Sequence, residues 1–148
     1  MHGKVVALCI SEEKGVPKHS VEEIILETNY GIVGDAHAGT ERQVSLLEEE
    51  NIMELRKEGY LIQYGDMAEN IVTTGIKLDS LPIGTTLRVG NAELKIIQKG
   101  KVCHVGCQVY KRIGKCLMRQ KGIFAHVVKG GKVKLGDTVE VISPQSIH

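Results

Sequence analysis

The apolar residues of this chain fall into short runs rather than long helical stripes. Residues 4–10 form one apolar run, and a polar loop over 11–20 separates it from a second run over 21–27. β-Branched residues in the second run, and the glycines Gly31 and Gly34 after it, favour a strand leading into a tight loop over a helix. Five further β-rich runs predict strands at 71–74, 85–89, 93–98, 123–128 and 138–142.

One segment has the pattern of a helix. Ser45 and Glu48 have the spacing of a capping box, in which a hydroxyl and a carboxylate satisfy two backbone N–H groups at a helix start. The pattern predicts a helix over 46–58, closed by Gly59 in the left-handed conformation. Its first turn carries acids and its last turn bases, as the helix dipole favours: Glu48, Glu49 and Glu50, then Arg56 and Lys57.

Turn residues separate the predicted strands. Gly90-Asn91 and Gly130-Gly131 are typical of hairpin turns, and Gly136-Asp137 of a turn before the last strand. Many glycines and few aromatic residues suit sharp turns between short strands, and closure into a barrel leaves no strand edge unpaired. We therefore expect a mainly β fold, a closed β-barrel with a few helices, forming a single domain over 3–142 and followed by a C-terminal tail over 143–148.

Charge and hydropathy narrow the class of protein. The net charge is only +1, but most carboxylates precede Leu94 and the stretch after it is wholly basic until Asp137. No apolar run approaches the roughly 20 residues that span a bilayer, and the first ten residues lack the features of a signal peptide. The default expectation is a soluble cytoplasmic protein, whose four cysteines are then free thiols or metal ligands rather than a disulfide framework.

The basic stretch contains three of the four cysteines. Residues 94–136 hold Cys103, Cys107 and Cys116 and no aspartate or glutamate. Nearby cations raise the thiolate fraction of a cysteine and also attract anionic ligands such as a phosphate-bearing cofactor. The pattern indicates sulfur or metal chemistry. The cations are Lys95, Lys99, Lys101, Lys111, Arg112, Lys115, Arg119, Lys121, Lys129, Lys132 and Lys134.

Simpler interpretations of this stretch remain open. Cys103, His104, Cys107 and Cys116 could supply four zinc ligands, although Cys-x3-Cys is not the usual structural spacing. One or two of the cysteines could instead be small buried hydrophobes, the interpretation we favour for Cys9. Nucleic-acid binding ranks low because single-strand binders pair charge with aromatic stacking, and this chain has one Phe and no Trp.

Two loops combine glycines with polar side chains. The loop 34–39 places His37 between glycines, with Arg42 shortly after it, and such loops often carry function on a rigid scaffold. In the loop 65–70, Glu69 could accept a hydrogen bond from a ligand ring and Asn70 could donate one. Each loop alone is equally typical of an ordinary Asp- or Asn-containing turn. His19 lacks such a loop and is interpreted as a surface residue.

The ordered set of motifs resembles the MOSC domain, the C-terminal domain of molybdenum cofactor sulfurase. The resemblance rests on residues 34–46, 65–70, 100–107, 122–125 and 130–137, and it extends from about residue 3 to residue 142. It implies a closed barrel like that of pyruvate kinase. It also implies a stand-alone, single-domain protein that handles molybdenum cofactor or sulfur.

The resemblance also assigns roles. Cys107 aligns with the cysteine that ligates molybdenum or carries a persulfide, and Cys103 is the next candidate and a resolving thiol. The implied cofactor, molybdopterin or another anion, comes with a sulfur donor such as a cysteine desulfurase, and pyridoxal phosphate belongs only to that partner. No nucleic acid or membrane partner is implied. Candidate cofactor-binding residues are Asn70, Glu69, Arg42, His37, Lys101 and Arg119, and Lys111 and Arg112 are further candidates for holding a phosphate.

The chain departs from the larger oxidoreductases of this family. Those relatives carry an additional N-terminal domain, and an arginine shortly before the asparagine that matches Asn70, where this chain has Ala68 and Glu69. The departures favour sulfur transfer or accessory cofactor binding. The alternatives are a small molybdenum oxidoreductase that reduces N-hydroxylated compounds, and a structural zinc-binding interaction module.

Overall fold

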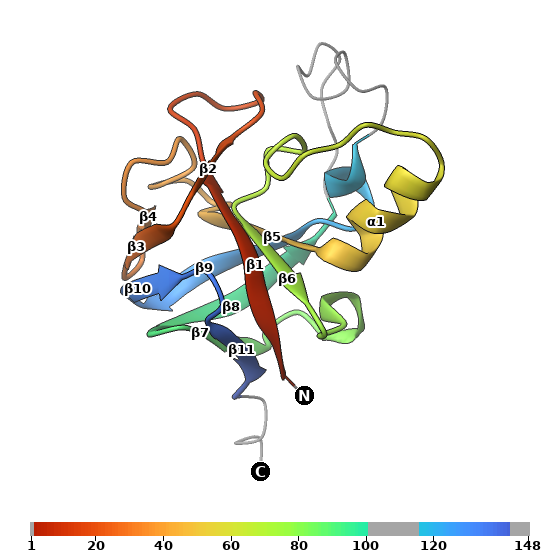
Figure 1. Ribbon diagram of the computed structural model, residues 1–148. Coiled ribbons are helices and arrows are strands. Elements are labelled where there is room, and N and C mark those ends of the chain that lie inside the picture. Colours follow the sequence, from red (N-terminus) through yellow and green to blue (C-terminus); the bar gives the residue numbers. More distant parts are fainter. Residues whose placement is uncertain (1, 101–115, 143–148) are drawn as a thin grey trace.

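The computed structural model describes residues 2–100 and 116–142 (Figure 1). The strands are β1 (His2–Ile10), β2 (His19–Val21), β3 (Glu23–Glu27), β4 (Gly31–Ile32), β5 (Val44–Glu48), β6 (Ile71–Thr74), β7 (Thr86–Val89), β8 (Ala92–Lys99), β9 (Ile123–Lys129), β10 (Gly131–Lys134) and β11 (Thr138–Val141). The helices of these residues are α1 (Glu49–Lys57) and two 3-10 turns, η1 (Leu78–Ser80) and η2 (Leu117–Arg119). The predicted tail over 143–148 lies outside the described residues.

Seven of the described strands close into a barrel, as the sequence predicts. Their order is β11-β7-β8-β9-β5-β6-β1, and pairing of β1 with β11 completes the ring. Neighbouring strands are antiparallel except β5 and β6, which run parallel because α1 and the following loop connect them. Beside the barrel, β10, β3 and β4 form a small sheet. The short strand β2 pairs antiparallel with the C-terminal end of β1.

Two apolar clusters stabilise the fold. One fills the barrel and includes Val44, Leu46 and Ile71. The other lies outside the wall and joins the alternate strand residues Leu47 and Val72 to Ile52 and Leu55 of α1 and to residues 116–118. Because β5 is buried on both faces, its side chains show no alternation between apolar and polar positions.

This double burial explains why the predicted helix start is wrong. Residues 44–48 form β5, and α1 begins only at Glu49. Ser45 and Glu48 make no capping box, because Glu48 itself occupies the cap position and its side chain accepts the Asp79 N–H at 3.2 Å instead of capping the helix. Other features of the prediction are confirmed: Glu49 and Glu50 lie in the first turn, although Glu48 precedes it, the last turn carries the predicted bases, and Gly59 follows the helix at φ +104°.

The predicted strands from Ile71 onward are confirmed to within one residue at each end, and Gly90-Asn91 is the hairpin turn between β7 and β8. The second predicted hairpin, Gly130-Gly131, is wrong. These glycines carry the chain from β9 in the barrel to β10, which pairs with β3. A Cβ at Gly130 would lie 2.5 Å from the Leu26 carbonyl oxygen, so glycine here permits the close approach of two backbones.

Candidate functional site

The two loops that the sequence singled out, 34–39 and 65–70, both contact the loop that follows β1. Lys18 N–H donates to the Gly65 carbonyl at 2.7 Å, and Ala36 N–H donates to the Ser11 carbonyl at 2.8 Å. These two bonds join the loop after β1 to both glycine-containing loops. The structure therefore brings together the two loops that the sequence could only consider separately.

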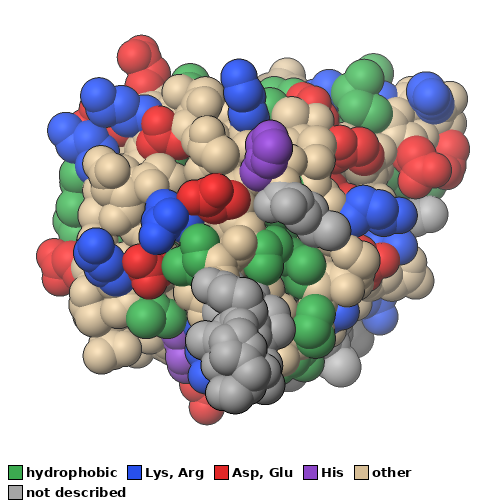
Figure 2. All heavy atoms as spheres, turned by 90° about the horizontal axis from the view of Figure 1, so that it is seen from below, with side chains coloured by type: hydrophobic (Ala, Val, Ile, Leu, Met, Phe, Trp, Pro, Cys, Tyr) green, Lys and Arg blue, Asp and Glu red, His purple; other side chains and the backbone are tan. Residues whose placement is uncertain are grey.

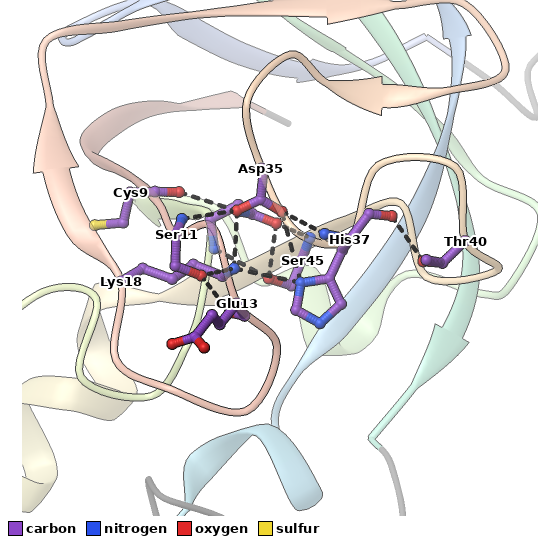
Figure 3. A network of polar contacts seen from close by, with 9 residues as sticks. Cys9, Ser11, Glu13, Lys18, Asp35, His37, Thr40 and Ser45 are labelled. Atoms are coloured by element: carbon purple, nitrogen blue, oxygen red, sulfur yellow. Dashed lines mark hydrogen bonds and ion pairs between the residues drawn. The ribbon is translucent and has the colours of Figure 1, made fainter.

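A buried polar network fixes the loop 34–39 (Figure 3). Asp35 accepts the Ser11 N–H and the Lys18 ammonium on Oδ1, at 3.1 and 2.8 Å, and the His37 N–H on Oδ2, at 3.0 Å. Burial alone would raise the pKa of Asp35, but the bonds from His37 and Lys18, with the Lys18 charge, lower it well below its ordinary value. The charged Asp35 carboxylate therefore anchors the loop after β1 to the loop 34–39.

Lys18 is a site residue that sequence reasoning missed. Its side chain is fully buried, and Nζ contacts Ser11 Oγ at 2.9 Å, Asp35 Oδ1 at 2.8 Å and His37 Nδ1 at 3.3 Å. Nothing in its sequence neighbourhood distinguishes it from the exposed Lys14, since its three partners lie 7, 17 and 19 residues away. His37 keeps a side-chain exposure of 20%, so its ring reaches solvent at the edge of the network.

The second loop is held by its own carboxylate. Glu69 accepts the backbone N–H groups of Gly65 and Met67 at 2.8 and 3.0 Å and is fully buried. Burial raises the pKa of Glu69 to about 7, against the opposing effect of these backbone donors. Cofactor binding by Glu69 stays a prediction, and the role its contacts define is to shape the loop.

Asn70 joins three strands of the barrel. Its Oδ1 accepts the Ser45 N–H at 3.0 Å, its backbone N–H donates to Ser45 Oγ at 3.0 Å, and its Nδ2 donates to the Cys9 carbonyl at 3.0 Å. The side chain is fully buried, so Asn70 ties β1 and β5 to the start of β6. Direct contact with a cofactor, which the resemblance implies for Asn70, stays a prediction.

One described end of the cysteine-containing segment, at Cys116 and Leu117, lies beside the second loop. The segment leaves β8 at Gly100, whose N–H donates to the Gly122 carbonyl at 2.7 Å, and returns at Cys116. Leu117 N–H points to Met67 Sδ at 3.4 Å, and Cys116 packs in the same apolar cluster. Cys103, Cys107, His104, Lys101, Lys111 and Arg112 lie outside the described residues, so their predicted roles are untested.

Two predicted arginines flank this region. The Arg42 guanidinium carbon lies 5.6 Å from the ring centroid of Phe124, a cation–π contact that leaves the side chain half-buried. Arg119 is exposed, and the described residues include no ion-pair partner for it. Anion binding by Arg42 and Arg119 stays a prediction.

In the folded protein, acidic side chains lie close to several cations of the basic stretch. Lys132 lies 3.5 Å from Glu23, and Lys121 lies 3.6 Å from Asp79, whose carbonyl also accepts from Lys99. Figure 2 shows one face on which acidic and basic side chains alternate without a large patch of one sign. The fold therefore brings acidic residues from the first part of the chain to part of the basic stretch.

The remaining predictions about single residues are settled by burial. Cys9 is fully buried, which confirms it as a small packing residue, and desolvation raises its pKa to about 12. His19 is exposed, as predicted. Among the described residues no group of three His, Cys, Asp or Glu side chains is arranged to hold a metal ion, and no helix is long and apolar enough to cross a membrane.

Two surface hollows lie away from these loops. One is lined by Arg88, Lys132, Lys134 and neighbouring residues of the hairpin at Gly90, and the other by Glu48, Glu50 and Glu54 beside Gly75. Neither contains a residue that the sequence predicts for the site.

Comparisons with solved structures support this architecture. The YuaD protein from Bacillus subtilis superposes with a TM-score of 0.78 at 21% identity, covering 95% of this chain and 96% of that one. YiiM from Escherichia coli gives a TM-score of 0.70 at 19% identity, covering 97% and 70%. YiiM from Geobacillus stearothermophilus gives 0.74 at 14% identity, covering 95% and 75%. At these identities the likeness shows the shared fold.

Comparison with curated proteins found no significant match. A family model of the MOSC domain, in contrast, matches residues 33–140, which is most of the chain and includes both site loops. The chain therefore belongs to the MOSC domain family, whose members are associated with molybdenum cofactor-related functions.

Proposed function

We propose that this protein handles molybdenum cofactor or its sulfur through a cysteine thiolate, with Cys107 as molybdenum ligand or persulfide acceptor and Cys103 as resolving thiol. The observation that carries the proposal is the cysteine-containing segment within a MOSC domain, whose described C-terminal end, at Cys116 and Leu117, adjoins Met67 of the loop 65–70. A thiolate is a good ligand for a soft metal centre and a good acceptor of sulfane sulfur.

The sulfur-transfer step is balanced without an added oxidant. The Cys107 thiolate attacks the outer sulfur of a persulfide on the donor protein, the donor's S–S bond breaks, and a new S–S bond forms on Cys107. The donor leaves as a thiolate, and the persulfide proton stays with the transferred sulfur. For delivery, the Cys103 thiolate attacks the Cys107 sulfur, the persulfide S–S bond breaks, a Cys103–Cys107 disulfide forms, and the outer sulfur leaves as hydrosulfide, so that the two cysteines supply the two electrons.

The described cations suit an anionic cofactor. Arg119 is exposed beside the returning segment, and Arg42 is half-buried over Phe124 with no N–H hydrogen bond to another described residue, so both could bind a phosphate oxygen. When bound, the cofactor would supply a molybdenum centre for which Cys107 is the proposed ligand. We propose that Arg119 and Arg42 hold its phosphate.

The test compares the wild type with Cys107→Ser and Cys103→Ser. After incubation with a cysteine desulfurase and cysteine, or with molybdenum cofactor, Cys107→Ser should lose the persulfide and the bound cofactor. Cys103→Ser should keep the initial persulfide but release it more slowly. Cys9, buried and with a raised pKa, serves as the internal unreactive thiol. Wild-type levels of both persulfide and cofactor in Cys107→Ser would contradict the proposal.

A further inference from the structure

The polar network around Lys18 determines the protonation of the His37 ring. A lysine ammonium carries three protons, and Lys18 Nζ has three acceptors: Ser11 Oγ, Asp35 Oδ1 and His37 Nδ1. The Ser11 hydroxyl donates its own proton to the Glu13 carbonyl at 2.8 Å, so its oxygen is free to accept from Lys18. Every donor in the network then has one acceptor.

Nδ1 of His37 must therefore be the unprotonated nitrogen. If Nδ1 carried a proton, its N–H would face the Lys18 ammonium, another donor, at 3.3 Å. The third proton of the fully buried Lys18 ammonium would then have no acceptor. Asp35 Oδ2 is the competing acceptor for a proton on Nδ1, but it lies 3.5 Å away, longer than an ordinary N–H···O hydrogen bond, whereas Lys18 Nζ lies 3.3 Å from Nδ1. The ring proton consequently resides on Nε2.

We propose that His37 Nε2–H is a fixed hydrogen-bond donor to an oxyanion ligand, and that Lys18 is the positioning residue that holds this tautomer. Figure 3 shows the outer ring nitrogen pointing away from the network. No described residue accepts a hydrogen bond from Nε2. A neutral donor held by a charge-balanced Lys18–Asp35 pair binds an anionic oxygen without a long, mobile side chain having to be ordered.

The proposal rests on the proposed function only for the identity of the ligand, an oxo or phosphate oxygen. The tautomer can be measured on the protein alone. Long-range proton–nitrogen NMR of histidine-labelled protein should show His37 with Nδ1 unprotonated and Nε2 protonated, and the exposed His19 as a mixture of states. A proton on Nδ1 of His37 would overturn the proposal whatever Cys107 does.

Two substitutions distinguish the contribution of Nε2 of His37 from that of Nδ1. His37→Asn keeps an acceptor near Nδ1 for Lys18 but removes the outer donor, whereas His37→Gln keeps a donor near Nε2. Titration with molybdate and, separately, with inorganic phosphate should shift the wild-type Nε2 resonance. Affinity should fall about tenfold in His37→Asn and less in His37→Gln.

The two oxyanions distinguish the ligand groups. A shift with molybdate alone identifies an oxo-metal ligand, and a shift with phosphate alone identifies the phosphate of a cofactor. Lys18→Met should convert the His37 signal to a mixture of tautomers and weaken the same binding. A wild-type His37 that responds to neither anion, or a His37→Asn variant that binds as tightly as the wild type, would overturn the donor role even if the tautomer is as stated.

Discussion

Lys18 Nζ lies 2.8 Å from Asp35 Oδ1, and neither side chain is accessible to solvent. The pair joins the loop after β1 to the loop 34–39, so it supports the fold and the candidate site together. Two buried charges of opposite sign tolerate joint replacement far better than the loss of one partner, which leaves the other charge uncompensated.

Lys18→Met should lower the free energy of unfolding by about 3–5 kcal/mol because Asp35 is left as an unpaired buried charge. Urea unfolding followed by circular dichroism measures the change. Adding Asp35→Leu should recover part of the loss, and not all of it, because the backbone N–H groups of Ser11 and His37 lose their acceptor.

The matched control is Lys132→Met, which removes an exposed ion pair with Glu23 at 3.5 Å and should cost less than about 1 kcal/mol. Equal losses for Lys18→Met and Lys132→Met would show that the Lys18–Asp35 pair is not the anchor described above.

Asp35 should also contribute to acid unfolding. Its pKa in the folded protein is lower than the ordinary 3.8, so the charged carboxylate adds stability above that pH and loses it as the pH falls further. Asp35→Asn should therefore be less stable than the wild type at neutral pH, and the difference should shrink below pH 3.8. Urea midpoints across the acid range measure it; a difference that grows on acidification would refute the assignment.

Glu69 should have the opposite pH dependence. Because burial raises its pKa from 4.5 to about 7, its contribution to stability is complete below pH 4.5 and is lost as the pH rises through about 7. Relative to Glu69→Gln, the wild type should lose about 1–3 kcal/mol between pH 5 and 8. Parallel unfolding curves for the two proteins over that range would contradict it.

Asn70→Ala should cost about 2–4 kcal/mol, since it leaves the Ser45 N–H and the Cys9 carbonyl without their buried partner. Thermal and urea unfolding give the value. Asn51→Ala is the control: Asn51 is a half-buried residue of α1 with no described side-chain bond, and the change should stay within about 0.5 kcal/mol. A neutral Asn70→Ala would mean that the three strands are not joined through this amide.

The sequence predicted the barrel because its strands from Ile71 onward have clear local patterns and glycine turns. It failed at Ser45, where a strand buried on both faces loses the alternating pattern and Ser45 bonds to Asn70, 25 residues away. It also failed at Gly130, because the partner of β10 is the distant β3 and not the preceding strand. Both errors arise from contacts that no local pattern encodes.

For the candidate site, the sequence identified the loops but not how they are connected. His37, Glu69 and Asn70 lie in glycine-containing loops and were found by that signal, whereas Lys18 and Ser11 belong to an ordinary polar loop. Their roles depend on Asp35 and Gly65, which are 17 or more residues away from Lys18. Burial also altered the interpretation of Glu69 and Asn70, because spacing cannot show that a polar side chain is fully enclosed.

The most direct test of the account is mass spectrometry of the intact native protein, isolated without reductant, beside Cys107→Ser. The account predicts that the wild type carries a bound pterin or one added sulfur atom, that fragmentation locates the added sulfur on Cys107, and that Cys107→Ser carries neither. A wild-type protein at its bare sequence mass after exposure to both a sulfur donor and molybdenum cofactor would contradict it.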